Sequence, residues 1–179
     1  RRFWTELIKD ASIQLLPRWP RKMRAGGHEQ VRGPELSVDP KALAGLKQLA
    51  QTAGVPLKTV LLAAHQRVMS FLGGQDDVIS GLVCNGRPEA ADGDKIIGLF
   101  LNTLPVRLRM EGGAWVNLVK ETFAVEQAIL PHRRVPLAEI QGWNDGQPLF
   151  EAAFDFVHFH VYKNLPHYQE GGFMEGHYF

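Results

Sequence analysis

Hydrophobic residues recur along this chain at two spacings, one typical of helices and one typical of strands. From residue 40 onward they recur every three or four positions, which is the pattern of a helix with one buried face. Asp39 can cap the free N–H groups at the start of this helix, and Pro40 suits its first turn. Gly54 ends it, because glycine readily adopts the left-handed conformation that closes a helix. The predicted inward positions are Leu43, Leu46, Leu49, Ala50 and Ala53.

Further helices follow from the same spacing. A long helix is predicted over 56–72 and is stopped by a pair of glycines, an amphipathic helix covers 114–130, and a short helix covers 136–143. Residues 3–10 have the pattern of the end of a helix. The predicted inward positions of the long helix are Val60, Leu61, Ala64, Val68, Phe71 and Leu72.

Strands are predicted near 29–38 and at 77–85, 99–110 and 151–162, where β-branched, aromatic and other apolar residues dominate. Residues 17–35 are rich in proline, glycine and arginine and predict a linker that leads into the first strand. The resulting order of elements is α, β, α, α, β, β, α, α, β. This order favours an α/β fold in which a sheet packs against helices.

One predicted strand has a polar centre. Asn102 and Thr103 interrupt an apolar run, and an unpaired buried amide costs about 1–3 kcal/mol, so protein, water or substrate must supply its partners. Pro105 cannot donate to a ladder, which indicates an edge strand or a bulge. Two interpretations stay open: the strand lines a cleft, or a satisfied core asparagine lies beside a sheet edge.

The same stretch resembles the late motif of the condensation domains of non-ribosomal peptide synthetases, Ile-Gly-x-Phe-x-Asn-Thr-x-Pro/Ala-x-Arg. The matching positions are Ile97, Gly98, Phe100, Asn102, Thr103, Pro105 and Arg107. Residues 85–89 resemble the Gly-Arg segment that precedes this motif, and 135–140 resemble the Pro-led helix that follows it. Residues 149–156 resemble the next strand, and 3–17 resemble the helix and linker between the two lobes of the family.

The resemblance implies an α/β lobe of the chloramphenicol-acetyltransferase type, with a mixed β-sheet packed against helices. It implies that 1–27 are the end of the inter-lobe helix and a linker, and that 28–179 are an incomplete C-terminal lobe. The catalytic signature of the family, His-His-x-x-x-Asp-Gly, is absent, because no two histidines are adjacent in the chain. We therefore expect a piece of a longer enzyme, whose catalytic histidine lies in an N-terminal lobe, and no activity from this piece alone.

Condensation domains join a donor acyl thioester and an acceptor aminoacyl thioester through an amide bond. The resemblance implies donor and acceptor carrier proteins, the N-terminal lobe and adjacent synthetase domains as partners. The carriers deliver the phosphopantetheine arm, so no directly bound cofactor is expected. Two alternatives remain, namely another carrier-dependent acyltransferase with the same lobe, and a non-catalytic module that docks carrier proteins.

Several residues are candidates for contact with substrate. Asn102 and Thr103 are expected to face the tunnel between the lobes, with Asn102 orienting substrate because an amide does not titrate. Arg87 either anchors a turn through backbone carbonyls or faces the cleft. His158 and His160 lie two apart on a predicted strand and share a face with phenylalanines, whereas the opposite face, which includes Val157, is expected in the core.

The same two histidines could form half of a zinc site, but no third ligand occurs at a diagnostic spacing, and no metal is expected. Of the remaining histidines, His65 is expected to be a surface or packing residue. His132 follows a helix end, where a cation interacts favourably with the helix dipole.

A cluster of cations occupies the predicted linker, interleaved with Trp19. Its members are Arg18, Arg21, Lys22 and Arg24. The cluster is either a solvated basic loop or a seat for an acidic carrier protein or the phosphate of its arm.

Composition restricts the remaining possibilities. The 179 residues suffice for one domain or one large lobe, and a net charge of +1 argues against nucleic acid as a main partner. Cys84 is the only cysteine, so there is no internal disulfide, and its apolar surroundings favour a buried thiol over a nucleophile. No apolar run approaches the roughly 20 residues that span a membrane. A single cysteine fits a reducing compartment, and a cytoplasmic protein is expected.

Overall fold

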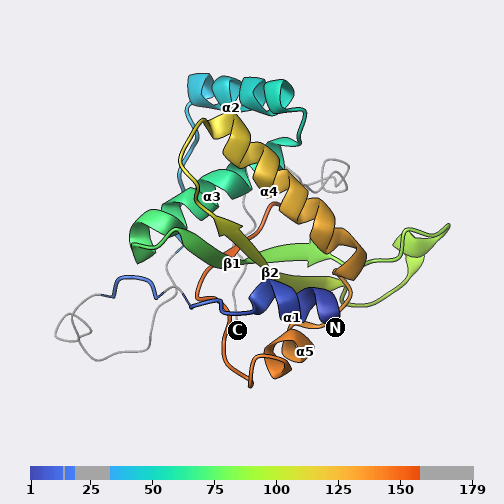
Figure 1. The fold of residues 1–179 in the computed structure, drawn as a ribbon. Coiled ribbons are helices and arrows are strands. Elements are labelled where there is room, and N and C mark those ends of the chain that lie inside the picture. Colours follow the sequence, from blue (N-terminus) through green and yellow to red (C-terminus); the bar gives the residue numbers. More distant parts are fainter. Residues whose placement is uncertain (14, 19–32, 158–179) are drawn as a thin grey trace.

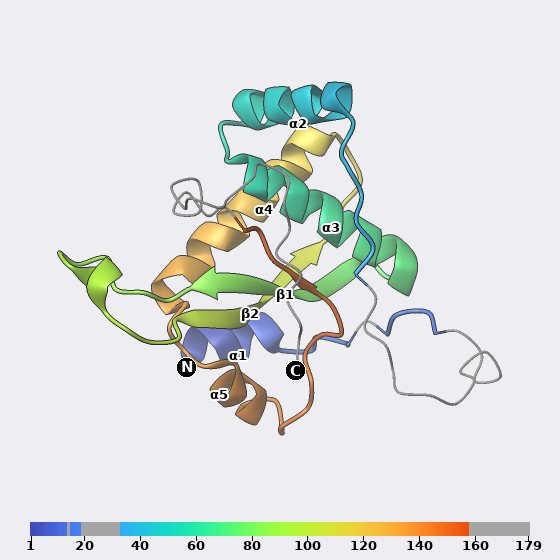
Figure 2. The ribbon, with the colours of Figure 1, turned by 180° about the vertical axis from the view of Figure 1, so that it is seen from behind.

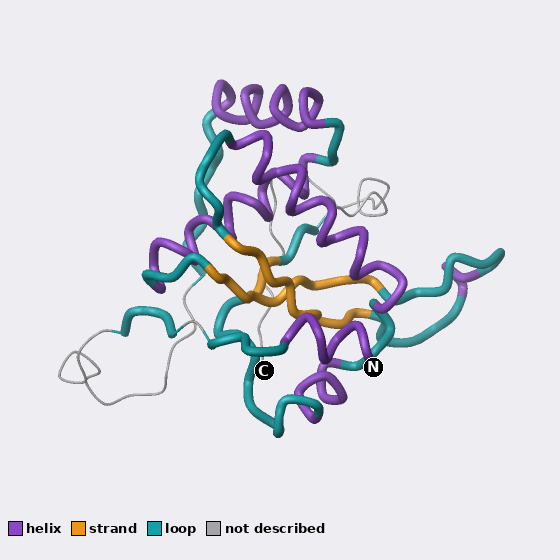
Figure 3. The backbone as a smooth tube through the Cα atoms, in the orientation of Figure 1, coloured by secondary structure: helices purple, strands orange, loops and turns teal. Residues whose placement is uncertain are grey.

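The computed structural model describes residues 1–13, 15–18 and 33–157. Three layers follow one another, with the sheet in the middle (Figure 1). Helices α3 (Leu57–Gly73) and α4 (Trp115–Ile129) cover one face, and α2 (Pro40–Ala53) packs on them from outside. The short helices α1 (Arg2–Ile8) and α5 (Leu137–Gly142) lie on the other side (Figure 3). The predicted α/β class, with helices against a sheet, is confirmed.

The sheet is mixed, as the resemblance implied. Strand β1 (Asp77–Asn85) pairs antiparallel with β2 (Leu101–Arg109) at every position, and parallel with the two-residue strand β3 (Ala153–Phe154). Among the described residues β2 is an edge strand, since the order is β2-β1-β3. Pro105 therefore lies in an edge strand, where the missing N–H of proline does not break the hydrogen-bond ladder of a central strand. The register between β1 and β2 continues through this position without a bulge.

Local capping works as predicted in α2. The Asp39 carboxylate accepts hydrogen bonds from the backbone N–H groups of Lys41 (2.9 Å) and Ala42 (3.1 Å). At the other end Gly54 has φ of 70°, the left-handed conformation that closes the helix. The buried stripe then faces α3 and α4, because the apolar spacing matches the helical repeat.

The inward face predicted for α3 was partly wrong. Phe71 is 72% exposed, and Val68 and Leu72 are exposed as well. The buried face instead carries polar side chains that find partners inside the protein. Thr59 donates to the Glu126 carboxylate, and Gln66 donates to a backbone carbonyl of β2. The buried residues of this helix are Thr59, Val60, Leu62, Ala63, Gln66, Met69 and Ser70.

Two strand predictions were also wrong in the described residues. Residues 33–38 form no strand, and the predicted strand 151–162 is reduced to Ala153–Phe154. Residues 155–157 lie outside any strand, and Val157 is exposed rather than in the core. Hydrophobic spacing alone cannot supply a pairing partner, and β3 pairs with β1 at only two positions.

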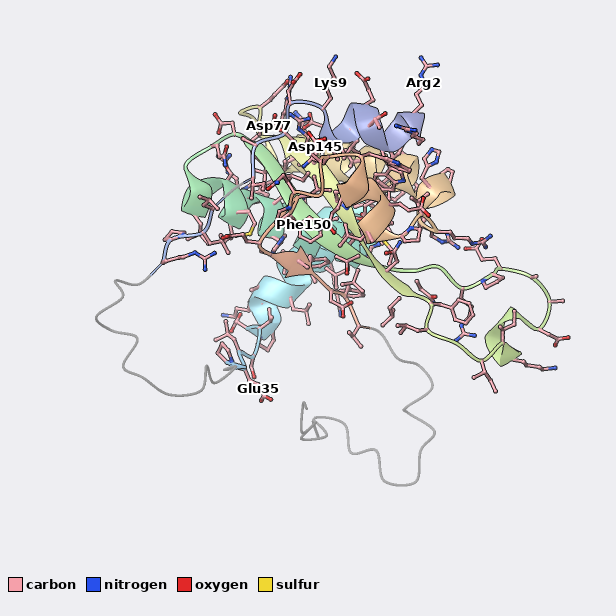
Figure 4. All side chains as sticks on the ribbon, turned by 90° about the horizontal axis from the view of Figure 1, so that it is seen from below. Arg2, Lys9, Glu35, Asp77, Asp145 and Phe150 are labelled. Atoms are coloured by element: carbon pink, nitrogen blue, oxygen red, sulfur yellow. The ribbon has the colours of Figure 1, made fainter. Side chains whose placement is uncertain are left out.

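The face of the sheet opposite α3 and α4 is covered by the segment leading into β3. Phe150, labelled in Figure 4, lies against Gly81 of β1, where a Cβ atom would be 2.6 Å from the phenyl ring. Glycine is needed here because any side chain would displace the ring. The core around this contact includes fully buried Trp4 and Ile140 from the two short helices.

Candidate substrate groove

Asn102 lies near the start of β2, opposite Cys84, and is half-buried. Its amide Nδ2 donates to the backbone carbonyls of Arg133 (3.1 Å) and Val135 (2.7 Å). The polar centre of the strand is thus paired by the segment that follows α4, so the cost of a buried, unpaired amide is avoided. Asn102 also ties that segment to the sheet.

The same asparagine borders an open groove of about 420 Å³. This volume lies within the range of small-molecule binding sites. The two interpretations of the polar strand are therefore both correct in part, because the amide is satisfied and still reaches a cavity. The groove is lined by Gly86, Pro88, Leu99, Phe100, Leu101, Asn102, Arg133, Arg134 and Pro136.

One wall of the groove belongs to a segment, 86–100, that extends away from the body of the molecule (Figures 1 and 2). Arg87 braces it from inside, since one guanidinium nitrogen donates to the carbonyls of Gly93 (3.0 Å) and Ile96 (2.5 Å). The guanidinium also lies 4.4 Å from the centre of the Phe100 ring. A Cβ atom at Gly93 would overlap the Pro88 carbonyl, which explains glycine there. Of the two predicted roles of Arg87, the turn anchor is the one its contacts form.

The part of this segment that leads back into β2, together with the first residue of that strand, is defined here as the arm (residues 96–101). It exposes large apolar side chains. Ile97 is 100% exposed and Leu99 is 87% exposed. Isolated exposed apolar residues are ordinary, but a run of them on a braced segment is typical of a surface that another part of a protein covers.

The other wall is held by two arginines that sequence analysis did not select. Arg133 pairs with Glu89 at 2.7 Å, and Arg134 donates to the Gly86 carbonyl at 3.3 Å. The Nε of Arg133 is buried and has no hydrogen-bond partner among the described residues. The Arg-Arg pair just before a Pro-led helix was the sequence signal that could have indicated this wall.

A further arginine of the motif fixes α1 to the sheet. The Arg107 guanidinium binds both carboxylate oxygens of Asp77 (2.8 and 2.6 Å) and the carbonyls of Leu7 (3.0 Å) and Lys9 (2.6 Å). Asp77 and Lys9 lie near each other beside α1 in Figure 4. The Arg107 hydrogen bonds lower the pKa of Asp77 and are only partly opposed by its desolvation.

Comparisons with known proteins show the family of this chain. The family profile described as the condensation domain matches residues 1–174. The chain belongs to the condensation-domain family. It is 39% identical over 161 residues to the AMB antimetabolite synthetase AmbE of Pseudomonas aeruginosa, and 34% identical over 170 residues to a plipastatin synthase protein of Bacillus subtilis. These alignments cover 88% and 92% of this chain but only 7% and 6% of the relatives.

Solved structures share the fold. A four-domain nonribosomal peptide synthetase bound to AMP and glycine aligns over 90% of this chain and 13% of its own, with a TM-score of 0.72 and 17% identity. The first condensation domain of the calcium-dependent antibiotic synthetase aligns over 86% of this chain and 34% of its own, with a TM-score of 0.65 and 19% identity. The chain thus spans about a third of that solved condensation domain.

The remaining predicted substrate residues are Thr103, His158 and His160. Thr103 is not among the residues that line the groove, because strand alternation turns it to the opposite face, beside Gly81 and Phe150. His158 and His160 lie outside the described residues. Within the described part of the chain, no three His, Cys, Asp or Glu side chains are grouped as a metal site would require.

The predicted carrier-binding cluster is only partly described. Arg18 forms an ion pair with Glu151 at 2.5 Å and remains largely exposed. The Leu16 backbone N–H, and then Arg18, lower the pKa of the Glu151 carboxyl. Arg21, Lys22 and Arg24 lie outside the described residues.

Two further titratable side chains have packing roles. Burial raises the pKa of the Cys84 thiol, which keeps it protonated and argues against a nucleophile. Burial lowers the pKa of His65, whose ring lies 5.6 Å from that of Phe154, so the packing prediction is confirmed. None of the helices in the described ranges has the length and apolarity to cross a membrane.

Proposed function

We propose that this chain is the C-terminal lobe of a condensation domain that forms an amide bond between carrier-bound donor acyl and acceptor aminoacyl thioesters. The observation that carries the proposal is the position of Asn102. In the motif by which the chain resembles its family, this residue borders an open groove while its amide nitrogen is held by the protein. A structural asparagine needs no groove beside it.

The chemistry of this lobe is orientation rather than proton transfer. Both hydrogens of the Asn102 Nδ2 have backbone acceptors, which fixes the direction of its Oδ1. An amide oxygen so fixed can accept a hydrogen bond from an N–H of the attacking amine and direct its lone pair toward the donor carbonyl. The base or positioning histidine belongs to the N-terminal lobe, since this chain contains no His-His pair.

The arm is the part of the lobe that closes this site. Ile97 and Leu99 would be buried against the N-terminal lobe, where covering them removes apolar area from water. In this arrangement residues 1–27 join the two lobes and residues 28–179 form the C-terminal lobe. The groove between the arm and residues 133–136 then becomes part of a tunnel that excludes water.

The partners are donor and acceptor carrier proteins, and their phosphopantetheine arms bring both substrates. Arg18, Arg21, Lys22 and Arg24 form the seat for an acidic carrier or for the phosphate of its arm. Arg18 is already paired with Glu151, so a carrier carboxylate would have to compete with that contact. Asn102 orients the substrate, and His158 and His160 are further candidates for contact with it. Thr103, beside Phe150, and Arg87, on the carbonyls of Gly93 and Ile96, receive no place in the groove.

The test is amide formation by the intact condensation domain with loaded donor and acceptor carriers, beside this 179-residue chain under the same conditions. The intact domain should yield the condensed product on the acceptor carrier, and the chain alone should yield none. Turnover by the chain alone would overturn the two-lobe mechanism. Carrier binding by the intact domain without product would instead identify a docking module, and acyl transfer to an acceptor other than an amine would identify a different carrier-dependent acyltransferase.

The variant Asn102→Ala in the intact domain tests whether the asparagine beside the groove contributes to turnover. We expect kcat to fall by about 10–100-fold, because a lost orienting contact misplaces the amine. The matched control is Asn117→Ala, an exposed asparagine on α4 away from the groove. Equal turnover by both variants would remove Asn102 from the mechanism.

A further inference from the structure

We propose that Phe3 and His132 are positioning residues that couple helix α1 to the wall of the Asn102 groove. The inference rests on the proposed function, since it concerns the geometry of the same groove. It starts from a contact between two segments that are far apart in the sequence, one in α1 and one in the turn that follows α4.

The contact itself is a close aromatic stack. The rings of Phe3 and His132 have centroids 4.2 Å apart and are inclined by only 20°. Fully buried Trp4 supports the pair, with its ring edge-on to Phe3 at 5.0 Å and to His132 at 6.5 Å. Such stacks restrict both rings, so a displacement of α1 must displace His132 or break the contact.

Helix α1 is held to this lobe at both ends. At its C-terminal end the carbonyls of Leu7 and Lys9 accept from Arg107. At its N-terminal end the Arg1 guanidinium lies 5.9 Å from the ring centre of Trp143. A seven-residue helix has little stability of its own, so these contacts determine its direction.

His132 is in turn directly connected to the groove. It ends the 3₁₀ turn Leu130–His132, and its carbonyl accepts from the Val135 N–H at 3.2 Å. The carbonyls of Arg133 and Val135 are the two acceptors of the Asn102 amide. A continuous set of contacts therefore runs from Phe3 through His132 to Asn102, although Phe3 and Asn102 belong to separate elements.

The consequence for the reaction follows from the location of α1. In the proposed two-lobe enzyme the chain enters this lobe through α1, so the orientation of one lobe against the other acts on this helix first. The stack transmits that orientation to the carbonyls that hold Asn102. Because a displacement of about 1 Å can cost about 100-fold in rate, breaking the stack should lower kcat more than it raises KM.

The first measurement is hydrogen exchange of the intact condensation domain, which does not depend on turnover. Phe3→Leu and His132→Ala should speed exchange in the 130–136 peptide by about tenfold relative to wild type. His132→Phe retains the stack and should restore protection. Phe71→Leu, at an exposed ring of α3, is the matched control and should leave the peptide unchanged.

The second measurement is a double-mutant cycle in kcat for amide formation. Phe3→Leu and Asn102→Ala should combine to less than the product of their separate effects, whereas Phe71→Leu and Asn102→Ala should multiply. Multiplicative effects for the first pair, or unchanged exchange in Phe3→Leu, would overturn the coupling. If the wild-type domain makes no product, the proposed function is refuted, and with it the catalytic role of the stack. The hydrogen-exchange measurement still tests whether the Phe3–His132 contact couples α1 to residues 130–136.

Discussion

Asn102 shows how one side chain can satisfy its own hydrogen-bonding groups and still prepare a site. Its Nδ2 joins β2 to the backbone of Arg133 and Val135, two residues that the sequence places about thirty positions away. These two hydrogen bonds hold β2 against the segment after α4, and they also fix the direction of the Asn102 Oδ1 atom. Strand alternation then separates it from Thr103, its neighbour in the motif, which packs under Phe150.

The two hydrogen bonds of the Asn102 amide predict a loss of stability on substitution, separate from any loss of activity. In Asn102→Ala two backbone carbonyls lose a donor, and we expect the free energy of unfolding of the intact domain to fall by about 1–2 kcal/mol. Asn102→Asp should be worse, because a carboxylate would face the same carbonyls. Urea unfolding measures both variants. Unchanged midpoints would mean that water replaces the amide without cost.

Gly81 gives a sharper prediction about packing. In Gly81→Ala the new Cβ would lie 2.6 Å from the Phe150 ring and 2.8 Å from Thr103 Cγ2, so the segment before β3 must move. We expect a loss of about 1–3 kcal/mol in the free energy of unfolding. Gly45→Ala is the control, because nothing lies within 4 Å of a Cβ there and alanine favours the helix. Equal stabilities of the two variants would contradict the close packing of Phe150.

At the scale of the elements, α1 is a short helix that depends on contacts with the rest of the fold. Arg107 binds its last carbonyls, Trp143 and His132 contact its first residues, and Trp4 anchors it in the core. A helix of this length forms because the lobe holds it. Its attachment is therefore sensitive to the ion pair between Arg107 and Asp77.

That ion pair predicts a pH dependence of stability. The pKa of Asp77 is lower in the folded than in the unfolded protein, so its contribution is present above the unfolded pKa and is lost as the pH falls through the folded value. We expect a contribution of about 1 kcal/mol, since the carboxylate is only partly shielded from solvent. The unfolding free energies of wild type and Asp77→Asn should therefore differ at about pH 7 and converge as the pH falls below the folded pKa of Asp77. A constant difference would assign the effect to altered packing instead.

At the scale of the whole molecule, several large apolar side chains are exposed in the described part of the chain. The arm exposes Ile97 and Leu99 beside the groove, and Phe71 and Trp115 are exposed on the helical side. Patches of this kind promote association when their covering domain is absent. Both walls of the groove come from this chain, and under the proposed function a surface of the N-terminal lobe closes it.

The 179-residue chain in isolation should consequently associate as its concentration rises. We expect its apparent mass in size-exclusion chromatography to increase with concentration, and the double variant Ile97→Ser/Leu99→Ser to reduce this increase. The double variant Leu36→Ser/Val38→Ser, at two exposed apolar residues that precede α2, is the matched control. A strictly monomeric wild-type chain would contradict the idea that the arm needs a cover.

Local patterns in the sequence were enough for the elements whose cause is local. Asp39 and Gly54 bound α2 by capping chemistry, and Pro105 indicated an edge strand because it lacks an N–H. The mid-chain motif identified the family, since its polar residues occur at unusual positions in an apolar strand. The hydrophobic pattern predicted part of the buried face of α3 wrongly, and it predicted too long a strand over 151–157. In both cases the outcome depended on partners distant in the sequence.

Only the tertiary structure determines which residues distant in the sequence become hydrogen-bond partners. The inward rotation of α3 required Glu126 and a β2 carbonyl to accept from Thr59 and Gln66, and no spacing of apolar residues encodes such acceptors. The groove arose in the same way, from carbonyls of the segment after α4 meeting an amide of β2. Periodicity determines which residues can be buried, whereas hydrogen-bond partners across the fold determine which of them are, and where a cavity stays open.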